Sequence, residues 1–111
     1  MKTVILDFEV EGYHNYPNAP EEVKFLSHPH RHLFQIRVGY KVDDPNREKE
    51  IFIQTDYLKE YIGECYGYPA QFENMSCEMI ASDLLEYIKP DNGIWVEVFE
   101  DGKGGARVDL W

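Results

Sequence analysis

Two segments in the first half of the chain alternate between apolar and polar residues. In residues 4–10 the apolar side chains lie mainly at even positions, and residues 34–42 repeat this pattern. A period of two is typical of strands with one buried face. Residues 12–20 lie between these segments and are rich in glycine, asparagine and proline, which favour turns. The two segments therefore predict an antiparallel hairpin.

The middle of the chain predicts two helices. Residues 43–46 mark a turn, residues 50–55 are typical of an extended segment, and residues 56–62 place apolar side chains at helical spacing. We expect a longer helix to begin near Ser76, whose hydroxyl is a suitable N-cap, and to end before the turn at residues 90–93.

The end of the chain predicts a second hairpin. Residues 94–99 and 106–110 alternate on either side of a turn at residues 101–105, which contains three glycines. The order of the elements predicts an α+β fold, with a four-stranded antiparallel sheet and two helices that both lie between the second and third strands and pack on one face. We expect the whole chain, residues 1–111, to form a single domain.

All four histidines lie between residues 14 and 32, at the open end of the first predicted hairpin. His14, His30 and His32 lie at even positions, like the apolar residues of the two strands. If each strand is extended by a few residues, the three histidines therefore lie on its buried face. The end of the first strand and the start of the second are neighbours in an antiparallel hairpin, so these three residues can converge on one ion. Three imidazoles with an open fourth position are typical of catalytic zinc.

Two alternatives remain open at this point. The histidines could be ordinary polar residues at a hairpin tip, because turn-forming residues surround them. The choice of ligands is also open, since His28 and His30 have the same spacing as His30 and His32. The later pair is favoured because it continues the alternation of the second strand.

Composition and charge narrow the classes of partner. The formal net charge of -10 opposes close approach to phosphate backbones and anionic lipid, so neither nucleic acid nor a membrane is expected as a partner. No apolar run approaches the roughly 20 residues needed to cross a bilayer. The amino terminus lacks the features of a signal peptide, and the two cysteines, Cys65 and Cys77, show no paired spacing. We therefore expect a cytoplasmic protein with free thiols.

Aromatic residues exceed what a core of this size can bury. The residues that cannot all lie inside are Tyr13, Tyr16, Tyr66, Tyr68, Phe72, Trp95 and Trp111. A short sheet also leaves two open edges. Association of several copies of the chain would bury these surfaces, so we expect a homo-oligomer.

Five segments form an ordered pattern over nearly the whole chain. They are His14, residues 30–34 (HRHLF), 51–59 (IFIQTDYLK), 76–81 (SCEMIA) and 96–101 (VEVFED). In order and spacing they resemble the tunnelling-fold family that includes 6-pyruvoyl-tetrahydropterin synthase and 6-carboxy-tetrahydropterin synthase. The last four segments are similar, in turn, to the family's His-Gly-His-Asn-Tyr, Met-Val-x-Asp-Phe-x-x-Leu-Lys, Thr-x-Glu-Asn-x-Ala and Val-x-Val-x-Glu-Thr.

The resemblance implies a zinc ion bound by the three histidines and a site for a flat heterocycle beside it. Glu100 matches the family's pterin-anchoring glutamate, whose carboxylate can accept hydrogen bonds from a ring N–H and an adjacent exocyclic amine. Ser76 and Cys77, at the start of the second helix, match residues that add contacts to the ring. The resemblance also implies assembly from trimer rings.

The chain departs from this family in the groups that transfer protons. Family synthases use a cysteine shortly before the His-x-His segment and an Asp-His pair ahead of the second helix. Residues 15–29 contain no cysteine, and residues 63–75 contain no histidine. General acids and bases must lie within hydrogen-bond reach of the proton they move, so the usual synthase reaction is not expected. Candidates for replacing these groups are Cys65, Tyr66, Tyr68 and Glu73.

Three hypotheses for the function follow. The first is a zinc-dependent lyase or isomerase that acts on a pterin-type substrate. The second is a non-catalytic module that binds or sequesters a purine, a pterin or a nucleotide-derived molecule. The third is a structural protein in which the histidines are polar loop residues and the aromatic residues form an assembly surface.

Overall fold

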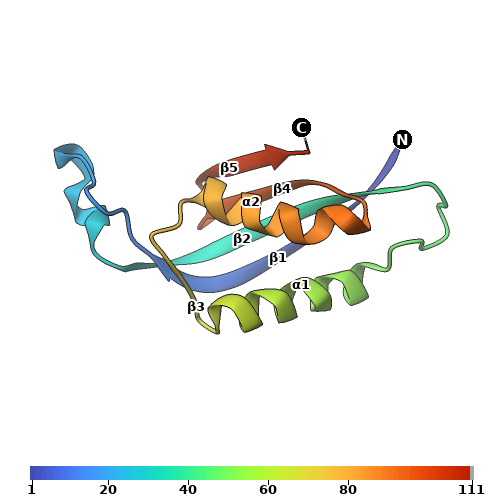
Figure 1. Ribbon diagram of the computed structural model, residues 1–111, viewed down its shortest axis with the longest axis horizontal. Coiled ribbons are helices and arrows are strands. Elements are labelled where there is room, and N and C mark those ends of the chain that lie inside the picture. Colours follow the sequence, from blue (N-terminus) through green and yellow to red (C-terminus); the bar gives the residue numbers. More distant parts are fainter. Residues whose placement is uncertain (111) are drawn as a thin grey trace.

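The long hairpin predicted at the start of the chain is confirmed by the computed structural model, which describes residues 1–110 (Figure 1). The strands β1 (Lys2–His14) and β2 (His30–Val42) pair antiparallel along their whole length. A 3-10 segment, η1 (Glu21–Ser27), lies in the loop between them. Trp111, which the predicted domain and aromatic surface include, lies outside the described residues.

The sheet has five strands in the order β3-β1-β2-β4-β5 and is mixed. The strands β4 (Gly93–Glu100) and β5 (Gly104–Asp109) form the predicted second hairpin, and β4 pairs antiparallel with β2. The prediction of four antiparallel strands is wrong, because β3 (Ala70–Glu73) pairs in parallel with the end of β1. With four residues, β3 is too short for the alternation of buried Ala70 and Phe72 to be recognised in the sequence.

The first helix, α1 (Ile51–Tyr66), includes the segment predicted to be extended, so that prediction is wrong. A carboxylate oxygen of Glu50 accepts a hydrogen bond from the backbone N–H of Ile53 at 2.9 Å and caps the helix. The first three residues of α1 are types that favour strands. Each is at least 48% exposed, so none of them is buried on a sheet face. Leu58 and Ile62, both fully buried, anchor the helix instead.

The second helix, α2 (Cys77–Ile88), confirms the longer helix predicted after Ser76. The Ser76 hydroxyl oxygen accepts a hydrogen bond from the backbone N–H of Met79 at 3.2 Å. A short 3-10 segment, η2 (Lys89–Asp91), follows α2 and leads into β4. None of the helices described for residues 1–110 combines the length and the apolar character that a membrane span requires.

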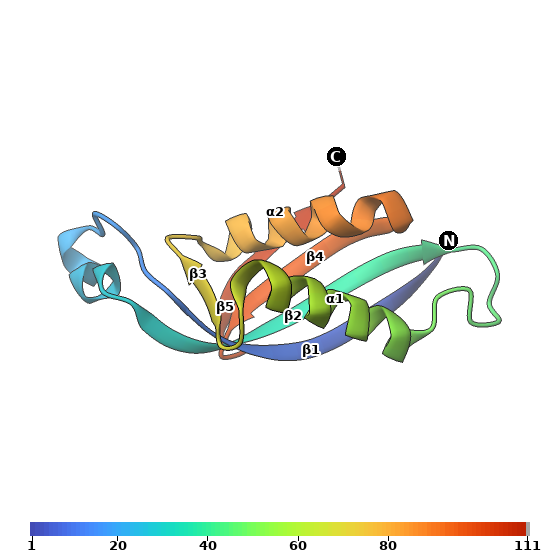
Figure 2. The same ribbon diagram turned by 60° about the horizontal axis from the view of Figure 1, so that its bottom comes forward.

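Both α-helices cover the same face of the sheet, and the core lies between them and the strands (Figures 1 and 2). Phe34 and Val38 of β2 are fully buried in this core, as is Phe72 of β3. Tyr16 and Tyr68 are 49% and 60% exposed. Phe72 and Trp95, which the sequence also assigned to the excess aromatic residues, are buried.

One carboxylate joins the two α-helices through two tyrosines. The hydroxyl of Tyr61 lies 3.1 Å from both carboxylate oxygens of Asp83, and the hydroxyl of Tyr66 lies 2.5 Å from one of them. Burial raises the pKa of both tyrosines well above the ordinary value, and the Asp83 carboxylate raises it further. Both phenols are therefore neutral donors over the physiological range of pH.

Two stretches of sheet edge lack a strand neighbour within the described residues. β3 covers β1 only from Gly12 to His14, and β5 is paired only on the side of β4. An uncovered strand presents unpaired backbone N–H and C=O groups and can pair with another chain.

Candidate metal centre and pocket

Three of the four histidines meet where β1 ends and β2 begins. His14 lies opposite His30 in the strand pairing, and His32 lies two residues farther along β2, on the same face of the sheet. One ring nitrogen from each residue lies within 4.8 Å of the other two. These three histidines could hold a metal ion.

His28 lies outside this cluster. It is exposed and follows η1 as its C-cap residue. Of the two histidine spacings that the sequence left open, the structure brings together the later pair, His30 and His32, with His14. The alternation of β2 explains this result, because His28 precedes the strand.

The rings of His14 and His30 are each held by a main-chain carbonyl. Nδ1 of His14 lies 2.9 Å from the carbonyl oxygen of Met75, and Nδ1 of His30 lies 2.9 Å from that of His28. A carbonyl oxygen can only accept, so Nδ1 of each ring carries the proton that is donated. In the neutral imidazole the other nitrogen, Nε2, then has a free electron pair, and this is the form that binds metals.

The ring of His32 is held by a carboxylate. Its Nδ1 lies 2.7 Å from Oδ2 of Asp101, and Oδ1 of Asp101 accepts a hydrogen bond from the backbone N–H of Leu33 at 2.9 Å. These bonds lower the pKa of Asp101, and the bond to His32 is the larger cause. The free nitrogen of His32 is again Nε2. Asp101 was not recognised in the sequence because 69 positions separate it from His32.

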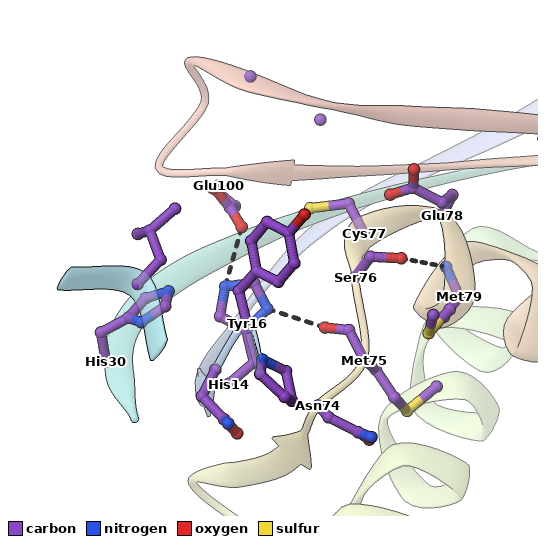
Figure 3. Close-up of a pocket in the computed structure, with 15 residues that line it drawn as sticks. His14, Tyr16, His30, Asn74, Met75, Ser76, Cys77, Glu78, Met79 and Glu100 are labelled. Atoms are coloured by element: carbon purple, nitrogen blue, oxygen red, sulfur yellow. Dashed lines mark hydrogen bonds and ion pairs between the residues drawn. The ribbon is translucent and has the colours of Figure 1, made fainter. Parts of the chain in front are cut away.

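The Glu100 carboxylate faces two of these free nitrogens. Its Oε2 lies 2.9 Å from Nε2 of His14 (Figure 3). Its Oε1 lies 3.8 Å from Nε2 of His32. Both Nε2 atoms are buried, and neither has a partner in hydrogen-bond geometry within the described residues. Electron pairs on nitrogen and oxygen therefore face one another across a short gap. A positive charge, either a proton or a metal ion, would turn this repulsion into attraction.

Burial distinguishes between these two sources of positive charge. It is the largest cause that lowers the pKa of His14 below its ordinary value, whereas the Met75 carbonyl and the Glu100 carboxylate act in the opposite direction. The neighbouring His30 and His32 lower the pKa of His14 further. A proton on His14 is thus disfavoured near neutral pH, and the three histidines could hold a metal ion in its place.

A pocket of about 710 Å³ opens beside the histidines (Figure 3). Its walls come from the hairpin tip, from residues 74–79 around the start of α2, and from the end of β4 and the start of β5. Sites for small molecules typically have volumes of about 300 to 1,000 Å³. The pocket therefore has room for a small ligand next to the candidate metal centre.

The three residues predicted to bind the ligand all line this pocket: Glu100, Ser76 and Cys77. Because the Ser76 oxygen accepts the capping bond from α2, its own proton is free to donate. The Cys77 thiol is 8% exposed, and burial raises its pKa to about 12, with a further contribution from the adjacent Glu100 carboxylate. The thiol is therefore protonated at neutral pH.

Two further pocket residues were not assigned to the site from the sequence. The ring of Tyr16 projects into the pocket from the hairpin tip (Figure 3). Met75 lines the pocket and supplies the carbonyl that holds His14. Tyr16 lies two positions after His14 and shares its parity, and this feature of the sequence could have assigned it to the site. No feature of the sequence indicates Met75, because tertiary packing alone brings the segment before α2 to the end of β1.

The residues considered as replacements for the family's proton-transfer groups do not line the pocket: Cys65, Tyr66, Tyr68 and Glu73. Cys65 is exposed on α1, and the hydroxyl of Tyr66 is bonded to Asp83. The hydroxyl of Tyr68 donates to the carbonyl of Lys59. Within residues 1–110, Cys77 is the only cysteine that lines the pocket.

No model of a protein family matches the chain, and no curated protein matches it. The likeness to the tunnelling-fold family thus remains a prediction from the sequence motifs.

Proposed function

We propose that this protein binds a zinc ion through His14, His30 and His32 and binds a flat heterocycle, a pterin or a purine, in the adjacent pocket. The observation that carries the proposal is the pair of buried Nε2 atoms, on His14 and His32, that lack hydrogen bonds and face the Glu100 carboxylate. A divalent cation satisfies both nitrogens and is attracted by the carboxylate. Three neutral imidazoles suit zinc, whereas magnesium and calcium prefer oxygen ligands.

The polar groups of the pocket support a ligand with adjacent hydrogen-bond donors. When the imidazole nitrogens are bound to metal, the Glu100 carboxylate is left to accept from a ring N–H and an exocyclic amine, as pterins and guanine present them. Ser76 and Cys77 can donate to acceptor atoms of the ring. Leu26 and Met75 supply apolar walls on which a flat ring can pack.

The same pocket supports two versions of this function. In a zinc-dependent lyase or isomerase, the metal would polarise oxygen atoms of the substrate and acidify a neighbouring C–H bond. In a binding or sequestering module, the metal would only orient the ligand. The protonated Cys77 thiol favours the second version, because a thiol with a pKa of about 12 is a poor base at neutral pH.

We further propose a cytoplasmic homo-oligomer with the trimer rings and tunnelling fold implied by the sequence motifs. The uncovered edges of β1 and β5 support assembly, because strands of neighbouring copies can pair there. The net charge of -10 supports a small-molecule partner over nucleic acid or anionic lipid.

Metal analysis combined with mass spectrometry of the molecules released on denaturation tests this function. We expect about one zinc per chain and a released pterin or purine. Protein purified without a ligand is then titrated with guanine and with pterin by calorimetry, with and without zinc. Failure to bind zinc even after its addition would contradict the metal centre. Zinc binding without affinity for either ring system would contradict the heterocycle site.

A further inference from the structure

Asp101 occupies a special position at the end of β4. The last pair in the β2–β4 ladder is Phe34 opposite Glu100, so the next residues to meet are Leu33 and Asp101. The backbone N–H of Asp101 donates to the carbonyl of Leu33 at 2.9 Å. In return, the backbone N–H of Leu33 donates at 2.9 Å to the Asp101 side chain. The carboxylate thus replaces a main-chain carbonyl and extends the ladder by one pair.

The backbone conformation of Asp101 explains why its carboxylate, and not a main-chain carbonyl, accepts the bond from Leu33. Its φ is 54°, in the left-handed region, so the chain turns away from β2 at this residue. Asp and Asn adopt this conformation more readily than most other side chains. The bond from Leu33 fixes Oδ1, and its partner Oδ2 is thereby aimed at Nδ1 of His32, 2.7 Å away.

His32 is the one member of the candidate metal centre that is held by a charge. The other two rings donate to main-chain carbonyls, those of Met75 and His28. A carboxylate bonded to Nδ1 of a metal-binding histidine fixes the tautomer and orientation of the ring and makes Nε2 a stronger electron donor. Asp101 also adds a negative charge on the far side of the ring from the cation.

We propose that Asp101 is a positioning residue that holds His32 with Nε2 free for the metal and thereby strengthens metal binding. This inference rests on the proposed metal centre and goes beyond it, because Asp101 does not bind the metal itself. Loss of such an outer partner typically weakens metal affinity by about 10- to 100-fold.

Two variants separate the carboxylate from the backbone conformation. Asp101→Asn tolerates the left-handed φ but replaces one of the two acceptor oxygens with an NH₂ donor, so the present bonds to Leu33 and His32 cannot both be kept. Asp101→Gly tolerates the conformation and removes the side chain entirely. Asp56→Asn makes the same change of charge at an exposed position on α1 and is the matched control.

The zinc affinity of each folded protein is measured by competition with a chelator, and urea denaturation checks that each variant is folded. We expect zinc dissociation constants about 10- to 100-fold higher in both Asp101 variants, and no change in the control. Equal zinc affinity in the control and both Asp101 variants would overturn the inference. The same outcome alongside tight zinc binding by the wild type would leave the metal centre itself intact.

NMR of the ring nitrogens of His32 in metal-free protein tests the inference independently of zinc. We expect the wild type to hold His32 with the proton on Nδ1, and Asp101→Gly to populate the other tautomer. Identical tautomer populations in the two proteins would overturn the inference. If the wild type binds no zinc, the proposed function fails, and the tautomer measurement still decides whether Asp101 positions His32.

Discussion

The hydroxyl of Tyr66 on α1 and the carboxylate of Asp83 on α2 are joined by a hydrogen bond of 2.5 Å. Tyr61, five residues earlier on α1, bonds to the same carboxylate. Asp83 therefore links the two helices, which also meet where the rings of Tyr61 and Tyr87 stack with their centroids 4.0 Å apart.

The hydrogen bonds from Tyr61 and Tyr66 to Asp83 predict that the protein loses stability in alkaline solution. The pKa of Tyr66 is raised in the folded protein, so the folded state binds its proton more tightly than the unfolded state does. The stabilisation is fully present below the ordinary tyrosine pKa of about 10 and is lost as pH rises through the folded pKa. The free energy of unfolding, measured with urea between pH 8 and 11, should fall above pH 10.

Tyr66→Phe should lower stability at pH 8 by roughly 1.5 to 3 kcal/mol, the range for a hydrogen bond to a charged acceptor. It should also make the alkaline decline shallower, because the shifted group is gone. Tyr57→Phe changes an exposed tyrosine on the same helix and serves as the control. An alkaline decline of unchanged slope in Tyr66→Phe would exclude Tyr66 as its source.

Removal of a single imidazole from the metal centre should abolish zinc binding. His30→Ala or His32→Ala leaves only two imidazoles, which is too few for a stable site of this type. His28→Ala should retain about one zinc per chain, because His28 lies outside the cluster. Zinc is measured by elemental analysis after dialysis. Full occupancy in both His30→Ala and His32→Ala would show that the ligands are different residues.

Glu100→Gln should weaken the binding of a guanine- or pterin-type ligand by roughly 1.5 to 3 kcal/mol, because it loses a charged acceptor. Oligomer size should be unchanged, and both proteins are loaded with zinc so that loss of the charge that attracts the cation does not enter the comparison. Calorimetry of wild type and variant, both loaded with zinc, measures the difference. Glu97→Gln alters a glutamate on the same strand that pairs with Arg37 and Arg107 and is absent from the pocket, so it provides the control. Equal affinities of wild type and Glu100→Gln would remove Glu100 from the ligand site.

The protein should assemble into a homo-oligomer at micromolar concentration, because strands at uncovered edges gain main-chain hydrogen bonds by pairing with other copies. Light scattering coupled to size-exclusion chromatography gives the mass directly. A single monomer peak would contradict the prediction.

Activity on dihydroneopterin triphosphate should be weak or absent. Loss of a positioned acid or base typically costs about 10²- to 10⁴-fold in rate, and the candidate replacements lie outside the pocket. The assay compares the zinc-loaded protein with an authentic synthase under the same conditions. Comparable turnover would reveal a proton-transfer group that the geometry of the pocket does not identify.

The strands that carry the histidines could be predicted because their pattern is local and long. Thirteen residues of β1 and thirteen of β2 alternate with little interruption, so the hairpin and the parity of its histidines follow from the sequence. The cap at Ser76 was predictable for a similar reason, since a hydroxyl ahead of a periodic apolar stripe signals the start of a helix.

The elements that were missed depend on contacts between distant parts of the chain. The start of α1 consists of strand-favouring residues, and its helical form follows from the Glu50 cap and from burial farther along the helix. The four residues of β3 acquire their role only through the end of β1. The bond between Asp101 and His32 depends on the register of β2 against β4, which single-strand patterns do not specify.

The parity shared by the histidines and the core has a consequence for folding. His14 continues the row of Phe8 and Val10 on β1, and His32 continues the row of Phe34 on β2. Shifting either strand by one residue would turn its histidine and its apolar residues together to the opposite face of the sheet. A chain paired in the wrong register could not assemble the three imidazoles. If zinc binds as proposed, it would bind only chains whose first hairpin has this register and would stabilise that register over the others.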